Sequence, residues 1–241
     1  MAEKIIVLIR HEQTIENQTG IIQGQLIGGT LASLECDPYR IAWLKKHLIE
    51  NGVLISSDTN RAHQSALRMS SALGVPIEIC SLLRQRSWGS AEGQSKHLLR
   101  GAILGNAYLT DANHLYPGAE SLQEVTKRAK IVWSYLSTRP ERTIFVCTHD
   151  EFSNYIVNEA LQEGLFRRHL LFNEGHLFDV DNGIPQQINL HSSMSIPPIK
   201  KYVVVRHDAH TFLAYELGRK ILLNRGIELV GQEATIGSSL I

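Results

Sequence analysis

The stretch KIIVLIRHE, from Lys4 to Glu12, decides the fold of this chain of 241 residues. Its uninterrupted apolar run, rich in β-branched side chains, predicts a buried β-strand over residues 4–9. Arg10 and His11 follow where that strand should end, and in open α/β sheets ligands bind at the carboxyl ends of the strands. A planar guanidinium can bind two oxygens of one anion, so phosphate is the natural ligand for such a pair.

The rest of the chain alternates short β-branched runs with longer helical patterns, which is typical of an α/β sheet covered by helices. Further strands are predicted over three ranges: 53–57, 76–80 and 143–148. Helices are predicted over 59–73, over 121–136 and in the residues after His149. The expected fold class is therefore α/β, with a mainly parallel sheet and helices on both of its faces.

The helix predicted over 121–136 has the clearest start signal. Ser121 and Glu124 match the capping-box pattern, in which each side chain bonds the backbone amide of the other residue. One side of this helix is apolar and should face the core, through Leu122, Val125, Ala129, Val132 and Leu136.

The charge of the chain is balanced, because Lys plus Arg and Asp plus Glu both number 24 and no long block of like charge stands out. This balance argues against a nucleic-acid or membrane-surface partner, although it allows a local basic pocket. The N-terminal residues lack the long apolar core of a signal peptide, and no apolar run approaches the roughly eighteen residues that a membrane span needs. We therefore expect a soluble protein with no membrane partner.

The cysteines predict a reduced setting. Cys36, Cys80 and Cys147 lie far apart in the sequence without a paired spacing. This arrangement indicates free thiols, and hence a cytoplasmic location.

The last part of the chain is expected to lie outside the main domain. Residues 1–190 should form that domain, residues 191–199 a Ser/Pro-rich linker, and residues 200–241 an accessory β-α segment. Within this segment a strand is predicted over 202–205 and a helix over 211–223. Their apolar sides need a cover, which would be either the edge of the sheet or the second subunit of a homodimer.

Two other predicted strands end in residues that suit a phosphate group. Arg61 follows the 53–57 strand in the first turn of a helix, whose free amide groups also favour an anion. His149 and Asp150 follow the 143–148 strand. Because the carboxyl ends of parallel strands meet at one edge of a sheet, two histidines and two arginines should converge there.

Several motifs occur in an order that resembles one known family. They are Arg10-His11-x-x-Thr14-x-x-Asn17, Gln23-Gly24, Ser57-Asp58-x-x-Arg61-Ala62-x-Gln64-x-Ala66, Leu83 through Gly93, Gly118-Ala119-Glu120-Ser121 and Thr148-His149. Together they span about residues 3–190 and resemble the histidine phosphatase superfamily, also called phosphoglycerate mutase-like, in its branch with an Arg-His-Gly motif. The resemblance depends on the joint order of the motifs rather than on any one of them.

The resemblance implies a phosphomonoester phosphatase that acts through a phosphohistidine on His11. Arg10, Arg61 and His149 would bind the equatorial oxygens, where charge gathers in the transition state. Substrate-binding roles are expected for Asn17, Gln85, Glu120 and Thr148. The expected partner is a small phosphorylated substrate, and the resemblance implies neither a metal nor another cofactor.

The chain departs from the family pattern at three positions. The family usually has glycine after each histidine, where this chain has Glu12 and Asp150. Gln85 stands where the family commonly has the glutamate that protonates the leaving oxygen, and glutamine cannot donate that proton. Losing a general acid slows the release of a poor leaving group by a factor of roughly a hundred to ten thousand.

Asp150 is the expected replacement acid. The acid phosphatase and phytase branch of the superfamily takes its acid from a His-Asp pair, and His149-Asp150 reproduces that pair. The alternative is a helix N-cap, since aspartate is among the best capping residues. A capping carboxylate would bond the amides of residue 152 or 153, whereas an acid would face the predicted phosphate site.

Two other functions stay open on the sequence alone. A catalytically weak or inactive module that binds a phospholigand or a protein would also explain Gln85. A phosphoglycerate mutase is less favoured, because mutases of this family carry a longer, arginine-rich insertion before the Gly-Glu-Ser motif. Residues 94–117 of this chain are short by comparison and contain a single arginine, Arg100.

Overall fold

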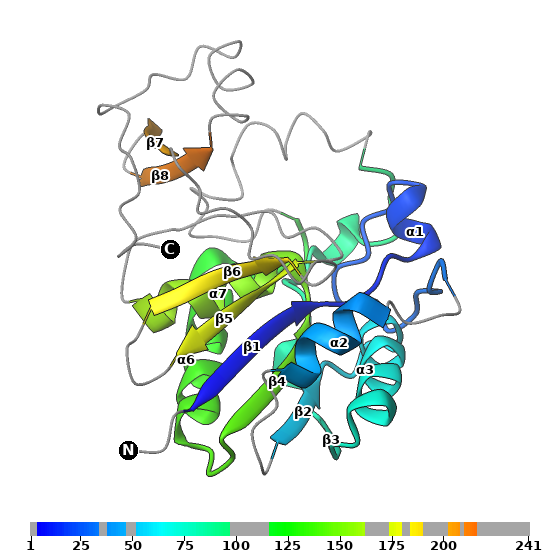
Figure 1. Cartoon of the computed structure of the whole chain (residues 1–241). Helices are drawn as coiled ribbons and strands as arrows, with labels where there is room; N and C mark the ends of the chain where they lie inside the picture. The colour runs from blue at the N-terminus through cyan, green and yellow to red at the C-terminus, as the bar shows by residue number, and fades with distance from the viewer. Residues whose placement is uncertain are drawn as a thin grey trace.

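The computed structural model describes eight segments of the chain: 4–33, 38–46, 52–96, 116–161, 174–179, 184–189, 202–207 and 210–215. The main sheet is built from β1 (Ile5–Arg10), β2 (Gly52–Ser56), β3 (Ile77–Ile79), β4 (Thr143–Thr148), β5 (Glu174–Asp179) and β6 (Ile184–Asn189). The helices are α1 (Ile15–Gln18), α2 (Pro38–Lys46), α3 (Asn60–Leu73), α6 (Leu122–Thr138) and α7 (Asp150–Leu161), with short 3₁₀ turns at Ser81–Leu83 and Gly89–Ala91. Figure 1 shows their arrangement.

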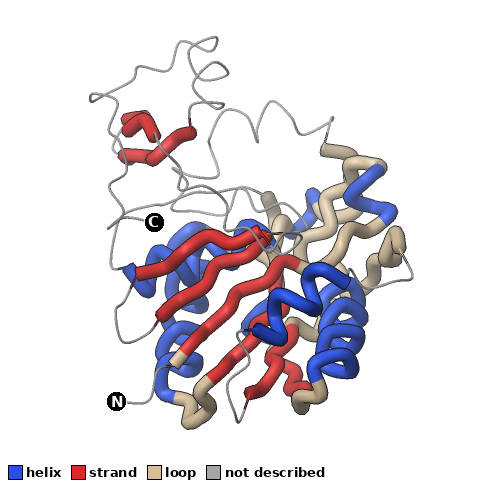
Figure 2. The backbone as a smooth tube through the Cα atoms, in the orientation of Figure 1, coloured by secondary structure: helices blue, strands red, loops and turns tan. Residues whose placement is uncertain are grey.

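The main sheet has the strand order β3-β2-β4-β1-β5-β6. The strands β3, β2, β4 and β1 run parallel, whereas β5 and β6 are antiparallel additions beside β1. Figure 2 shows the sheet with helices on both of its sides. The predicted α/β class, the four predicted strands and the three predicted helices are confirmed.

The alternation of side chains along each strand divides the core into two layers. Ile6 and Leu8 of β1 pack with α6 and α7, whereas Val7 and Ile9 pack with α2 and α3. These four side chains are fully buried. Each such aliphatic side chain contributes roughly 1.5–3 kcal/mol on burial, so helices on both faces are needed to cover the central strands.

The local signals for α6 are confirmed. Ser121 Oγ accepts a hydrogen bond from the Glu124 amide at 3.2 Å, and Glu124 Oε2 accepts one from the Ser121 amide at 2.8 Å. Its apolar side faces the core as expected, with Val125, Ala129, Val132 and Leu136 buried. At the end of α3, Gly74 adopts a left-handed conformation with φ of 70°, which a glycine tolerates without strain.

The sequence analysis did not predict α2, β5 or β6. The strand β5 depends on pairing with β1, far away in the sequence, and β6 in turn pairs with β5. Pro185 lies in β6, where it opposes Phe178. A proline lacks a backbone N–H, so it suits the outer position that β6 takes in this strand order.

The prediction for the C-terminal segment is partly wrong. The strand expected over 202–205 is present as β7 (Tyr202–His207). It pairs antiparallel with β8 (His210–Tyr215), so the first residues of the helix predicted over 211–223 form a strand instead. Pairing with β7 overrides the helical spacing because β-branched and aromatic residues in 211–215 favour a strand once a partner is available. Residues 216–223 lie outside the described segments, and the division at 190 and 200 stays a prediction.

Two further expectations concern membranes and cysteines. Within the described segments no helix has the length and apolar character required to cross a membrane. Cys80 and Cys147 are free thiols, and Cys147 is buried in β4. Cys36 lies outside the described residues.

The capping box of α6 provides a test of the fold. We expect Ser121→Ala to lower the free energy of unfolding by about 1 kcal/mol, because it leaves the Glu124 amide without its acceptor. Ser134→Ala is the matched control: Ser134 is exposed on the same helix, and alanine is the better helix former there. Urea denaturation followed by circular dichroism measures both, and equal stabilities would show that the box contributes nothing.

Candidate active site

The neighbouring ends of β1 and β4 bring two histidines together. Arg10 opposes Thr148 in the parallel register, so His11 and His149 each follow as their strands end. The His11 amide donates to the Thr148 carbonyl at 3.0 Å, which continues the ladder by one residue. The two imidazole rings meet edge to face with their centroids 5.1 Å apart, and both side chains are buried.

The tautomer of His11 follows from one hydrogen bond. Its Nδ1 lies 2.7 Å from the backbone carbonyl of Glu12, which can only accept, so Nδ1 carries the proton. The Nε2 atom therefore keeps its lone pair. Burial, together with the nearby guanidinium groups of Arg61 and Arg10, holds the pKa of His11 well below its usual range. His11 is thus a neutral imidazole at neutral pH, with its lone pair on Nε2.

His149 is held by two hydroxyl groups from the loop after β2. Its Nε2 lies 3.2 Å from Ser57 Oγ and 3.4 Å from Thr59 Oγ1. Burial lowers the pKa of His149 as well, with Arg61 and His11 adding to the effect. Contacts of Ser57 and Thr59 with His149 were not expected from the sequence, where Ser57 stands in a family motif and Thr59 is a candidate cap of the following helix.

Arg61 lies at the start of α3 and is 1% exposed. Its guanidinium donates to the backbone carbonyls of Gly24 at 2.6 Å and Leu26 at 2.9 Å, so the loop before α2 fixes its position. Within the described segments the buried Nε makes no hydrogen bond, so its N–H is a donor that an anion can use. Burial lowers the pKa of Arg61 to about 10, so the side chain stays charged at neutral pH.

Arg10 and Asp150 form a pair beside the histidines. Arg10 Nη1 lies 3.9 Å from Asp150 Oδ2, and the Asp150 side chain is 17% exposed. The amides that a capping carboxylate would bond have other acceptors: the Phe152 amide donates to Gln85 Oε1, and the Ser153 amide donates to the His149 carbonyl. This pattern favours a carboxylate that faces the cations over a simple helix cap.

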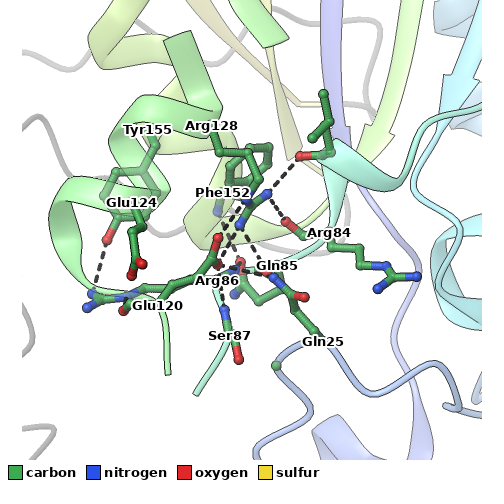
Figure 3. A network of polar contacts seen from close by, with 12 residues as sticks. Gln25, Arg84, Gln85, Arg86, Ser87, Glu120, Glu124, Arg128, Phe152 and Tyr155 are labelled. Atoms are coloured by element: carbon green, nitrogen blue, oxygen red, sulfur yellow. Dashed lines mark hydrogen bonds and ion pairs between the residues drawn. The ribbon is translucent and has the colours of Figure 1, made fainter. Parts of the chain in front are cut away.

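Gln85 binds the start of α7 (Figure 3). Its Oε1 accepts from the Phe152 amide at 3.1 Å and from the Arg86 amide at 3.2 Å. The side chain therefore supplies the acceptor that the first turn of a helix needs. Because α7 begins directly after His149, Gln85 bonds the first turn that follows this histidine.

Glu120 is fixed by an ion pair with Arg128. Arg128 donates to both carboxylate oxygens, at 2.8 and 2.7 Å, and the Ser87 amide donates to Glu120 at 2.8 Å. Arg128 also donates to the backbone carbonyls of Leu82 and Arg84, each at 2.7 Å. Figure 3 shows these bonds converging on the loop that carries Gln85, so the pair positions that loop.

Asn17 and Thr148 have bonds within the protein. Asn17 Oδ1 accepts from the Thr14 hydroxyl at 2.9 Å, while no hydrogen bond within the described segments uses its amide Nδ2. The Thr148 hydroxyl donates to the Leu83 carbonyl at 2.8 Å. Asn17 thus keeps donors for a ligand, whereas Thr148 links β4 to the segment before Gln85.

The order of these residues along the chain matches one family throughout. The family model of the histidine phosphatase superfamily (branch 1) matches residues 6–175, which include both histidines and Arg61. The chain belongs to this superfamily.

Comparisons with individual proteins agree with the family. The chain is 26% identical over 151 residues, which are 61% of its length and 73% of the relative's, to "Putative phosphoserine phosphatase 2" of Hydrogenobacter thermophilus. Among solved structures it is similar to a mycobacterial hydrolase, at a TM-score of 0.60 and 20% identity over 73% of this chain and 82% of that one. It is also similar to a mycobacterial glucosyl-3-phosphoglycerate phosphatase, at a TM-score of 0.56 and 21% identity over 73% and 89% of the two chains. These likenesses to solved structures establish the fold.

A further buried carboxyl lies beside the site of this superfamily member. Glu151 follows Asp150 in α7, accepts from the Tyr155 hydroxyl at 3.2 Å and lies 3.9 Å from Arg86 Nη1. Burial raises its pKa to about 7, and the Arg86 charge offsets only part of that effect.

Among the residues that the structure describes, no group of three His, Cys, Asp or Glu side chains is arranged to hold a metal ion.

The raised pKa of Glu151 predicts a change in stability with pH. Because the folded-state pKa of about 7 exceeds the ordinary value of 4.5, the folded protein keeps a proton that the unfolded chain releases between these values. Stability should therefore fall as pH rises through this window. The Glu151→Gln variant has no carboxyl group to ionise and so does not lose this stability. The free energy of unfolding of the variant minus that of wild type should therefore increase between pH 5 and pH 8, by on the order of 2 kcal/mol.

Chemical denaturation at several pH values measures this difference. The matched control is Glu159→Gln, on the same helix and less buried. A difference between Glu151→Gln and wild type that stays constant with pH would show that Glu151 ionises normally in the folded protein.

Proposed function

We propose that this chain is a phosphomonoester phosphatase that acts through a phosphohistidine on His11. The observation that carries the proposal is the Nδ1–H bond from His11 to the Glu12 carbonyl, which leaves Nε2 as a neutral nucleophile among buried cations. Membership of a superfamily of phosphatases supports the same chemistry.

The proposed reaction has two displacements at phosphorus. His11 Nε2 attacks in line and forms an N–P bond while the P–O bond to the leaving group breaks, with the electron pair passing to the leaving oxygen. A water molecule then attacks the phosphohistidine, the N–P bond breaks, and inorganic phosphate is released. His11 returns to its neutral state with the proton still on Nδ1.

Arg10, Arg61 and His149 are the proposed ligands of the phosphoryl oxygens. Their burial strengthens each interaction with the charge that develops on those oxygens, because little water screens it. A neutral His149 serves this role as a hydrogen-bond donor. Asn17 is proposed as a further donor at the mouth of the site, since its Nδ2 is not engaged by the described residues.

Asp150 is the proposed general acid in place of the glutamate that Gln85 replaces. Its carboxylate lies 3.9 Å from Arg10, and the Phe152 and Ser153 amides are occupied by other acceptors. Gln85 and Glu120 would then shape the substrate side of the site, with Arg128 holding their loops in place. Thr148 is proposed to support the site indirectly: it pairs with Arg10 across β1 and β4, and its hydroxyl donates to the Leu83 carbonyl.

A small phosphorylated metabolite is the proposed substrate. The names of the relatives refer to phosphoserine and to glucosyl-3-phosphoglycerate, which are both small phosphate esters. The second candidate function is a module that binds a phospholigand without efficient turnover, and the glutamine at position 85 favours it. Release of phosphate from p-nitrophenyl phosphate separates the two, because this good leaving group needs little help from an acid.

The nucleophile can be tested directly. We expect His11→Ala to abolish turnover of p-nitrophenyl phosphate, while circular dichroism shows an unchanged fold. Quenching wild type during turnover of ³²P-labelled substrate should trap an acid-labile phosphohistidine. His63→Ala, a partly buried histidine on α3, is the control and should retain activity. Label on another residue, or full activity in His11→Ala, would exclude the mechanism.

The role of Asp150 predicts a dependence on the leaving group. Asp150→Asn should slow hydrolysis of an alkyl phosphate by roughly a hundred-fold or more and that of p-nitrophenyl phosphate only slightly, because only the alkoxide needs a proton as it departs. Adding Gln85→Glu to this variant should recover part of the lost rate. One oxygen of the new carboxyl can accept from the Arg86 and Phe152 amides, which leaves the other oxygen to carry the proton. Small and equal effects on both substrates would identify Asp150 as structural.

A further inference from the structure

The residue after the nucleophile is unusual in its chemistry and its burial. Glu12 occupies a position where the superfamily usually has glycine, and it is 8% exposed. A carboxylate that is removed from water is costly unless cations and hydrogen bonds compensate it. This chain therefore needs partners for Glu12 that a glycine would not require.

Those partners come from two helices that cover the same face of the sheet. Glu12 Oε2 accepts from Arg68 Nη1 of α3 at 3.1 Å, and Oε1 lies 3.7 Å from Arg40 Nη1 of α2. The Glu12 amide donates to Ser65 Oγ at 3.0 Å. We call these four residues the Glu12 cluster. Both ends of the residue are thus fixed, its amide by one contact and its carboxylate by two.

The same residue holds the nucleophile. The Glu12 carbonyl accepts the Nδ1–H of His11 at 2.7 Å, so the orientation of this carbonyl sets the tautomer and the angle of the imidazole ring. We propose that Glu12 is a positioning residue for His11, and that its ion pairs with Arg68 and Arg40 hold the carbonyl in place. Its effect on catalysis rests on the proposed function, whereas its effect on the tautomer does not.

One face of α3 couples this cluster to the phosphoryl ligands. Arg61, Ser65 and Arg68 are spaced by four and three residues, so they lie along one side of the helix. Ser65 Oγ donates to the Arg61 carbonyl at 2.8 Å while it accepts from the Glu12 amide. The helix that carries Arg61 therefore also fixes the residue that orients His11.

The cluster also adjusts the charge around the site. Arg40 is 2% exposed, and its charge contributes to the lowered pKa of His11. Glu12 supplies the negative charge that compensates Arg40 and Arg68. A variant without that charge should bind inorganic phosphate more tightly while it forms the phosphohistidine more slowly, which separates positioning from a general loss of structure.

The test combines spectroscopy with kinetics on the full chain. Two-bond ¹H–¹⁵N spectra of ¹⁵N-histidine-labelled protein at pH 7.5 report the His11 tautomer, with His11→Gln used for assignment. We expect wild type to be protonated at Nδ1, and Glu12→Ala to show a mixture of the two tautomers. Rapid quench with p-nitrophenyl phosphate should show phosphohistidine formation slowed by about ten-fold or more, and Glu12→Gln should be intermediate.

Two further variants complete the experiment. Arg68→Met should slow phosphohistidine formation as Glu12→Ala does, and the double variant should lose little more, because both changes break the same contact. The double variant also removes Arg68, one of the two cations that Glu12→Ala leaves without this carboxylate. Glu141→Ala, which removes the ion pair between Glu141 and Arg139, is the matched control and should leave the rate of phosphohistidine formation and the His11 tautomer unchanged.

The outcomes separate the two proposals. An unchanged tautomer and an unchanged rate of phosphohistidine formation in both Glu12→Ala and the double variant would overturn the role of Glu12. Absence of any phosphohistidine in wild type would overturn the proposed function, while a tautomer change in Glu12→Ala would still support the positioning role.

Discussion

The parallel pairing of β1 with β4 is the constraint on which the site depends. Its register places Arg10 opposite Thr148, so the residues that follow, His11 and His149, leave the sheet side by side. One additional hydrogen bond, from the His11 amide to the Thr148 carbonyl, extends this order to the first residue beyond the strand. A slip of one residue would turn the apolar side chains of β1 to the wrong layers and separate the histidines. The burial of apolar side chains in the two core layers therefore fixes the strand register, and the register fixes where the two histidines lie.

The second constraint is electrostatic. Burial, together with the charges of the buried Arg61 and Arg10, lowers the pKa of both histidines and keeps both imidazoles neutral, and Arg40 adds to the effect at His11. This surplus of positive charge favours an anionic phosphoryl group, which would supply the missing negative charge. The carboxylates at Glu12 and Asp150, where relatives usually have glycine, pair with arginines at the wall of the site. This chain thus compensates part of its positive charge with its own side chains.

Much of this could be predicted from the sequence because the signals are local. The four parallel strands follow from short β-branched runs, and α6 follows from its capping box and its apolar periodicity. The neighbouring histidines follow from their places at strand ends. By contrast, β5 forms because it pairs with β1, far away in the sequence, and β6 in turn pairs with β5. β8 forms where a helical spacing suggested α-helix, because β7 provides a partner. The pairing of β5 with β1 has no signature within a short window of sequence, because its partner lies more than 160 residues away.

The sequence by itself determined the α/β class and the family, and it predicted the proposed nucleophile and its cations, because each depends on residue types at fixed places beside strands. The tertiary structure decided what individual polar groups do. It gave the Phe152 amide to Gln85 and turned Asp150 toward Arg10, and it surrounded Glu12 with Arg40, Ser65 and Arg68. These assignments require knowing which donors and acceptors meet across elements. In a buried site each polar group takes the partner that the packing of the helices brings within about 3 Å.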